Sequence, residues 1–205
     1  MITEDTIAAL ATPPGEGGIA VIRLSGAKSL RIARRLYVNG KREKQEQFED
    51  RYLHYGYILD KDQNTVDEVL LVYMKAPKTY TREDVVEIHC HGGMIPVQKI
   101  ITLTLEEGAR LAQPGEFTKR AFLNGRVDLA QAEAVMDLIS SKSEDAAKAS
   151  LNQMGGSLSR KIKALRDDLL DLMASIEVTV DYPEEDIEEM LRASIEKRLK
   201  EAKRE

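Results

Sequence analysis

The sequence is poor in residues that form covalent cross-links or metal clusters. It contains one cysteine, Cys90, three histidines and no tryptophan among 205 residues. A lone cysteine excludes an internal disulfide framework, because each such bond needs two thiols. An excess of basic residues is also missing, since 30 Lys and Arg stand against 35 Asp and Glu and leave a net charge of −5. The chain as a whole therefore lacks the positive field typical of nucleic-acid-binding domains, and any RNA contact would be local.

Long apolar runs are missing as well. No stretch approaches the length that a membrane-spanning helix needs, and the N-terminus lacks the basic and then apolar pattern of a signal peptide. Beyond residue 122 the only aromatic residue is Tyr182, which excludes a base-stacking platform in that part of the chain. We therefore expect a cytoplasmic protein without a membrane partner, with one sizeable core or two modest domains.

Glycines cluster in one N-terminal turn, but they do not form a phosphate-binding loop. Strands are predicted over 6–11 and 19–24, and the glycine-rich turn 12–18 lies between them. A dinucleotide fingerprint needs a helix after its glycines, whereas a strand-like run follows here. The segment Gly26-Ala27-Lys28-Ser29 also fails the Gly-Lys-Ser/Thr rule of a Walker loop. Gly15, Gly17 and Gly18 are instead expected to permit a tight turn, or a close approach of the backbone to another chain or a ligand.

Short β-branched runs separated by turns continue to residue 113. The pattern predicts a helix over 29–37, a charged loop over 39–50, a hairpin with strands over 52–59 and 66–74, a strand around 85–88 that Gly92-Gly93 ends, and a helix over 95–107. Strands mixed with helices of this kind indicate an α/β domain.

The stretch from Pro114 to Arg126 separates this part from one that is helical throughout. Pro114-Gly115 predicts a turn, the residues behind it a short helix, and Gly125 the end of that helix. Arg126 then lies at the joint between two architectures, a common location for ligand pockets. A plain linker with solvated arginines is the alternative.

The remainder of the chain shows helical periodicity. Asp128 is a good N-cap for a long helix that Gly155-Gly156 interrupts. A second helix carries a heptad-like apolar seam from Leu158 to Ile176. Pro183 and the acidic residues after it start a third helix, which still continues at Glu205, so the chain is expected to end inside a helix.

Four side chains of the first part are candidates for ligand contacts. Arg23 interrupts an apolar strand, and either a salt bridge at a sheet edge or a pocket would explain it. Glu87 shares a strand face with His89 and His91, just before the glycine pair. A ligand-binding carboxylate and a salt-bridging one are equally compatible with that position. The two histidines lack the third ligand that a zinc site would need, so no metal is expected.

Several runs of the sequence resemble the tRNA-modification GTPase family called MnmE or TrmE. They include Gly17-Gly18-Ile19-Ala20-Val21-Ile22-Arg23, Glu83-Asp84-Val85-Val86-Glu87, the stretch 114–125, Asp128-Leu129-Ala130-Gln131-Ala132-Glu133-Ala134 and Asp181-Tyr182-Pro183. The resemblance implies a folate-binding α/β domain of the aminomethyltransferase type over 1–118, which dimerises. It also implies the first helices of a central helical domain over 119–205, ahead of a GTPase domain that this sequence does not contain.

The resemblance also implies a function. The family binds a formyl-tetrahydrofolate one-carbon donor, here 5-formyltetrahydrofolate, and its contacts fall on Arg23, Glu87 and Arg126, where a lysine is common at the last position. With a flavin-dependent partner protein, MnmG or GidA, the family modifies the wobble uridine of tRNA. GTP, Mg²⁺ and K⁺ would belong to the GTPase domain only, and no catalytic residue is expected in these 205 residues.

Two other functions remain open. A stand-alone aminomethyltransferase-like enzyme would need its own acid or base beside the folate, and only Glu87 and the two strand histidines are candidates. A helical scaffold without a small ligand would leave Arg23 and Glu87 as ordinary surface charges.

Overall fold

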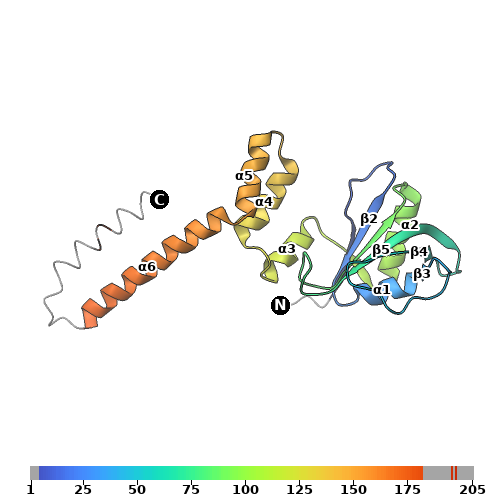
Figure 1. Ribbon diagram of the computed structural model, residues 1–205, viewed down its shortest axis with the longest axis horizontal. Helices are drawn as coiled ribbons and strands as arrows, with labels where there is room; N and C mark the ends of the chain where they lie inside the picture. The colour runs from blue at the N-terminus through green and yellow to red at the C-terminus, as the bar shows by residue number, and fades with distance from the viewer. Residues whose placement is uncertain (1–4, 182–194, 196, 198–205) are drawn as a thin grey trace. The chain divides into compact units, whose positions relative to one another are not determined.

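The computed structural model describes residues 5–181, 195 and 197. It divides the chain into two compact units, Met1–Val127 and Asp128–Glu205, and Figure 1 labels the helices and strands β2 to β5. The division falls later than the boundary predicted after residue 118. The reason is helix α3 (Glu116–Leu123), whose buried Arg120 makes ion pairs with Asp5 and Glu83 of the first unit.

Seven strands of the first unit form one sheet in the order β3-β4-β5-β6-β2-β1-β7. Its neighbouring strands are antiparallel, except that β1 and β7 run parallel. The predicted strands are confirmed, and the structure adds two strands of three residues each that the sequence pattern missed. The bounds are β1 Thr6–Leu10, β2 Ala20–Ser25, β3 Tyr37–Asn39, β4 Leu53–Leu59, β5 Thr65–Met74, β6 Val85–Cys90 and β7 Ala109–Leu111.

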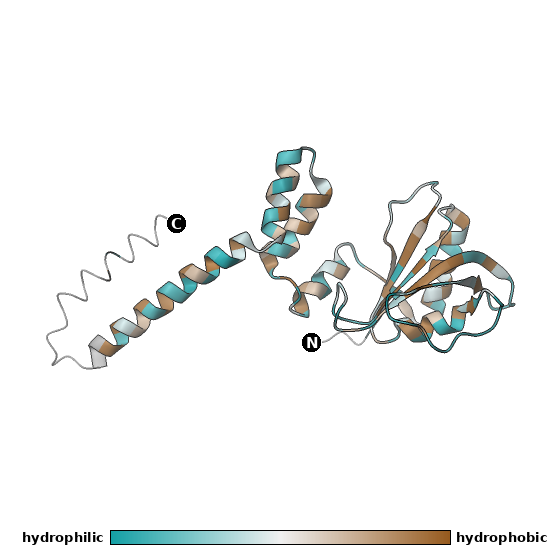
Figure 2. Cartoon of the chain, in the orientation of Figure 1, coloured by the Kyte–Doolittle hydropathy of each residue, from teal (hydrophilic) through white to brown (hydrophobic). Residues whose placement is uncertain are grey.

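Two helices pack on one face of this sheet. Helix α1 (Ser29–Leu36) buries Ile32, Ala33 and Leu36, and α2 (Met94–Glu106) buries Val97, Ile100 and Leu103. These side chains form one core with alternate residues of the strands, such as Ile22 on β2 and Ile88 on β6, and the apolar strands are visible in Figure 2. Because neighbouring residues of a strand point to opposite faces, Arg23, Glu87 and His89 lie on the other face and are only partly buried.

The glycine-rich turn makes a close backbone contact. A Cβ atom on Gly92 would lie 2.4 Å from the carbonyl oxygen of Gly17, so a side chain there would collide with the turn. Gly15 adopts a φ of +145°, a conformation that side chains disfavour. The predicted tight turn is therefore confirmed at Gly15. The close approach is made within the same chain, and it is Gly92 that must lack a side chain there, since a Cβ atom on Gly17 would meet nothing nearer than 3.9 Å.

The second unit contains three described helices, α4 (Leu129–Ser140), α5 (Glu144–Met154) and α6 (Ser157–Asp181). Asp128 caps α4 as predicted, in a reciprocal capping box with Gln131. The prediction of one helix up to Gly155 is wrong. Ser141 has extended backbone, and the side chain of Ser143 accepts a hydrogen bond from the amide of Ala146 and starts a new helix.

Helix α6 confirms the predicted helix with the heptad-like seam. Hydrophilic and hydrophobic residues alternate along it in Figure 2, and Leu158, Ile162 and Ile176 of the seam are exposed while Leu172 is buried. The third predicted helix, after Pro183, lies outside the described residues except for Ile195 and Lys197, which are both helical. Within the described part, no helix combines the length and apolar character needed to cross a membrane.

Candidate functional site

The C-terminal cap of the short helix α3 sets the backbone position of Arg126. The backbone turns through Gly125, whose φ of +69° is easily adopted only without a side chain. The amide of Gly125 donates to the carbonyl of Phe122, and the amide of Arg126 donates to that of Ala121, both over 2.9 Å. These two bonds form a Schellman cap, so Arg126 is the second residue after Asn124, the C-cap of α3. The predicted stop at Gly125 is confirmed.

Arg23 and Glu87 form an ion pair across two neighbouring strands. They face each other in the register of β2 and β6, and Nε and Nη2 of Arg23 each lie 2.7 Å from Oε1 of Glu87. The salt bridge that the sequence left open is therefore present. Its predicted location at a sheet edge is wrong, because β2 lies between β6 and β1. With 32% and 17% of the two side chains exposed, the pair is half-buried.

His89 faces the second oxygen of the same carboxylate. Its Nε2 lies 3.4 Å from Oε2 of Glu87, which confirms that the two share a face. His89 also lines an open cavity of about 290 Å³, together with Ile19, Tyr55 and Leu70. Glu87 thus has a cation on one side and an imidazole beside a cavity on the other.

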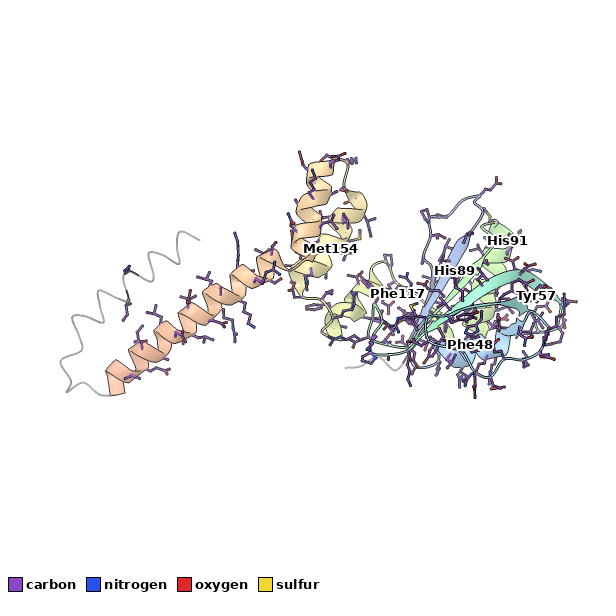
Figure 3. The ribbon with its side chains drawn as sticks, in the orientation of Figure 1. Phe48, Tyr57, His89, His91, Phe117 and Met154 are labelled. Carbon is purple, nitrogen blue, oxygen red and sulfur yellow. The ribbon has the colours of Figure 1, made fainter. Side chains whose placement is uncertain are left out.

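His91 has a different partner. Figure 3 labels both histidines, and His91 lies beyond the end of β6, where its Nδ1 is 2.7 Å from Oδ1 of Asp67. That carboxylate also accepts the amide of His91 and raises the pKa of the ring. In the part of the chain that the structure describes, no group of three or more His, Cys, Asp or Glu side chains is arranged to hold a metal.

Two aromatic rings connect the arginines with α3. The guanidinium carbon of Arg23 lies 5.8 Å from the ring centroid of Phe117, the second residue of α3, which Figure 3 labels. The guanidinium carbon of Arg126 lies 4.9 Å from the ring centroid of Tyr80. The hydroxyl of Tyr80 is hydrogen-bonded to that of Thr118 on α3 over 2.9 Å. The three predicted residues are thus linked: Arg23 with Glu87 directly, and Arg126 through α3.

A buried polar network joins the three segments that carry these residues. Arg120 of α3 donates to both carboxylate oxygens of Glu83, each over 3.2 Å. Glu83 follows Tyr80 in the loop between β5 and β6, and it accepts a 2.7 Å hydrogen bond from the hydroxyl of Ser25, at the end of the strand that carries Arg23. Only 3% of the Arg120 side chain is exposed.

Sequence reasoning missed the roles of Tyr80, Phe117 and Arg120. Each is an ordinary residue of its segment, and no spacing rule relates a loop tyrosine to an arginine 46 positions later. Arg120 was visible only as one of several basic residues in the stretch from 114 to 126.

The chemistry of the site suits ligand binding. A half-buried carboxylate accepts hydrogen bonds, two guanidinium groups donate them, and the aromatic rings offer flat apolar faces. Such a set fits a planar polar molecule that carries both N–H donors and anionic oxygens.

Comparison with known proteins covers both units. Residues 6–126 match the family model described as the N-terminus of the GTP-binding protein TrmE, and residues 129–205 match that of the MnmE helical domain. Proteins named tRNA modification GTPase MnmE are similar along the chain. The protein of Alkaliphilus oremlandii is 53% identical over 93% of this chain, that of Clostridioides difficile 51% over 100%, and that of Bacillus subtilis 53% over 91%.

The chain spans less than half the length of these curated relatives. The matched region is 41%, 44% and 41% of the three proteins, in the same order. The α/β unit followed by helices agrees with the two matched family models, so the predicted fold class is confirmed.

Proposed function

The chain belongs to the family of the tRNA modification GTPase MnmE, and we propose that its first unit binds 5-formyltetrahydrofolate through Arg23, Glu87 and Arg126. The observation that carries the proposal is the Arg23–Glu87 pair, which is half-buried on the sheet face that α1 and α2 leave free. When bound, the folate would supply a one-carbon unit.

The side chains fit the chemistry of a folate. A pterin presents adjacent N–H donors, and a carboxylate such as Glu87 accepts two of them at once. The formyl oxygen and the acidic tail are acceptors, which the forked donors of Arg23 and Arg126 suit. His89, which contacts Glu87, lines an open and partly apolar cavity. Flat heterocycles favour such surroundings.

The substitution Glu87→Gln tests the proposal. It keeps the shape of the side chain but replaces one acceptor oxygen by a donor, which faces the donors of the pterin. A hydrogen bond to a charged group contributes roughly 1.5–3 kcal/mol, so affinity should fall about tenfold or more. Fluorescence titration of 5-formyltetrahydrofolate into both proteins measures the change, and equal affinities would remove Glu87 from the site.

The chain offers a matched control in Glu107→Gln. Glu107 also pairs with an arginine, Arg35, over 2.6 Å, and 23% of its side chain is exposed. The pair lies on the helix side of the sheet, so this substitution should leave folate affinity unchanged. A loss as large as that of Glu87→Gln would mean that any broken Arg–Glu pair disturbs the unit, and would count against a specific role for Glu87.

We further propose that the first unit forms a homodimer. Leu53, Tyr55 and Leu70 support this proposal, because they are exposed on neighbouring strands of the free sheet face, and Tyr55 stands opposite Leu70. Sedimentation should show a dimer at a protein concentration of roughly tens of micromolar, the range in which a modest interface is populated. Leu70→Ser should shift the equilibrium to monomer. A monomeric wild-type chain would contradict the proposal.

The remaining family properties are proposals for the whole protein. They comprise modification of the wobble uridine of tRNA in the cytoplasm, together with the flavin-dependent partner MnmG, and hydrolysis of GTP. The name shared by the relatives supports tRNA modification and GTP hydrolysis. No Gly-Lys-Ser/Thr sequence occurs among the 205 residues, so we assign the GTP, Mg²⁺ and K⁺ sites to a part of the protein beyond them.

A further inference from the structure

Arg126 is exposed, yet it is held at two points. Its backbone is fixed by the Schellman cap of α3, through the hydrogen bond to Ala121. Its guanidinium carbon lies 4.9 Å from the ring centroid of Tyr80, within the range of a cation–π contact. A free surface arginine samples many rotamers, and a ligand that uses its forked donors must restrict them.

The ring of Tyr80 is itself held in place. Its hydroxyl is hydrogen-bonded to Thr118 over 2.9 Å, and Thr118 lies on the helix whose C-terminal cap carries Arg126. Nearby, Asn124 at the helix end donates to the carbonyl of Thr81 over 2.6 Å and ties the same loop to α3. The loop and the helix therefore hold the ring and the arginine in one fixed relation.

We propose that Tyr80 is a positioning residue, which pre-orders the guanidinium of Arg126 for the anionic or carbonyl oxygens of the folate. The inference rests on the proposed function, since Arg126 is one of its ligand contacts. Tyr80 lowers the entropy cost of binding, because the ring keeps Arg126 extended over one surface before the ligand arrives. It acts through Arg126, so its contribution should vanish when Arg126 is absent.

A double-mutant cycle tests this dependence. Arg126→Met should weaken 5-formyltetrahydrofolate binding about tenfold, as expected for loss of a charged hydrogen-bond donor. Tyr80→Leu should weaken it about two- to fivefold, the equivalent of one exposed cation–π contact. The double variant should bind no more weakly than Arg126→Met alone. Additive losses would overturn the inference, because Tyr80 would then act independently of Arg126.

A spectroscopic signature reports the positioning itself. The side-chain protons of Arg126 should show ring-current shifts in the NMR spectrum of the wild-type chain, and Tyr80→Leu should abolish them. Tyr80→Phe keeps the ring and loses only the hydrogen bond to Thr118, so it should retain most of the shift and most of the affinity. If Tyr80→Leu does not fold, Tyr80→Phe and Thr118→Val replace it in the test. Equal small decreases in the ring-current shift of Arg126 and in folate affinity support the inference, and unchanged values contradict it.

A second stacked pair in the same unit supplies the control. Arg42 lies over the ring of Tyr57, also at 4.9 Å. Tyr57→Leu removes an equivalent contact, and folate affinity should stay as in the wild type. The experiments distinguish failure of the proposed function from failure of this inference. If Glu87→Gln and Arg126→Met both bind folate as tightly as the wild type, the proposed function is wrong and this inference falls with it. A loss in those variants with unchanged binding by Tyr80→Leu removes this inference alone.

Discussion

Arg120 and Glu83 bind each other across the first unit: Nη1 of the arginine lies 3.2 Å from each carboxylate oxygen of the glutamate. The same guanidinium reaches Asp5 over 2.7 Å and Glu116 over 3.2 Å. One buried side chain therefore connects α3, the loop that carries Tyr80 and the residue before β1. The geometry of the candidate site depends on this connection, because α3 and that loop carry Phe117, Tyr80 and Arg126.

Arg120→Met should destabilise the chain severely. It leaves Glu83, with only 13% of its side chain exposed, without its arginine, while Glu116 keeps only its pair with Arg110. Removing one partner of a buried ion pair costs about 3–5 kcal/mol. Urea denaturation followed by circular dichroism measures the loss. Arg35→Met is the control, since it breaks an exposed pair and should cost about 1 kcal/mol or less. Similar midpoints for both variants would contradict the prediction.

Glu116 should make the chain sensitive to acid. The hydrogen bonds from Arg110, and those from the amide of Gln113 and from Arg120, lower the pKa of Glu116 from 4.5 to about 2. A depressed carboxyl pKa stabilises the folded state above the unfolded pKa, and that contribution is lost as the pH falls through the folded value. As the pH falls from 4.5 to 2, the free energy of unfolding of the wild type should decrease by up to roughly 3 kcal/mol more than that of Glu116→Gln. Urea unfolding at each pH measures both. Parallel pH profiles would contradict this.

The pair of His91 and Asp67 should titrate in the opposite sense. The hydrogen bond with Asp67 raises the pKa of His91 above its usual 6.5. The pair therefore contributes its full stabilisation of the folded state below pH 6.5, the usual pKa of histidine. This contribution is lost as the pH rises through the raised pKa. In Asp67→Asn the pKa of His91 should return to its ordinary value, which an NMR titration of the ring proton measures. An unchanged titration would mean that Asp67 does not hold the imidazolium.

Gly125→Ala should weaken the end of α3. The residue has a φ of +69°, which costs a residue with a side chain about 1 kcal/mol. A Cβ atom there would lie 3.6 Å from Nη1 of Arg82, an ordinary contact, so backbone strain alone accounts for the cost. Gly18→Ala is the control, because a Cβ atom at Gly18 would meet nothing within 4 Å. Thermal unfolding should show a lower midpoint for Gly125→Ala only.

The chain of 205 residues should not bind GTP. It has no Gly-Lys-Ser/Thr sequence whose backbone and lysine could hold the phosphates. Isothermal calorimetry should show no heat of binding with GTP. Micromolar affinity would reveal a nucleotide site of another kind.

Local patterns in the sequence were sufficient for most of the secondary structure. Alternating residues predicted the longer strands, Asp128 the start of α4 and Gly125 the end of α3, because these signals lie within a few residues of what they determine. Strands β3 and β7 were missed, since three residues are too few to show a period. The break between α4 and α5 was missed because Ser143 caps a helix inside a continuous helical pattern.

The sequence by itself determined the α/β part, the helical part and, through the resemblance to a family, the candidates Arg23, Glu87 and Arg126. Only the tertiary structure decided what these side chains contact. Arg23 meets Glu87, 64 positions away, because the register of β2 and β6 places them opposite each other. Tyr80 meets Arg126 because Arg120 and Thr118 tie its loop to α3. Such contacts depend on strand register and helix packing, which arise from the whole core and leave no pattern in any one segment.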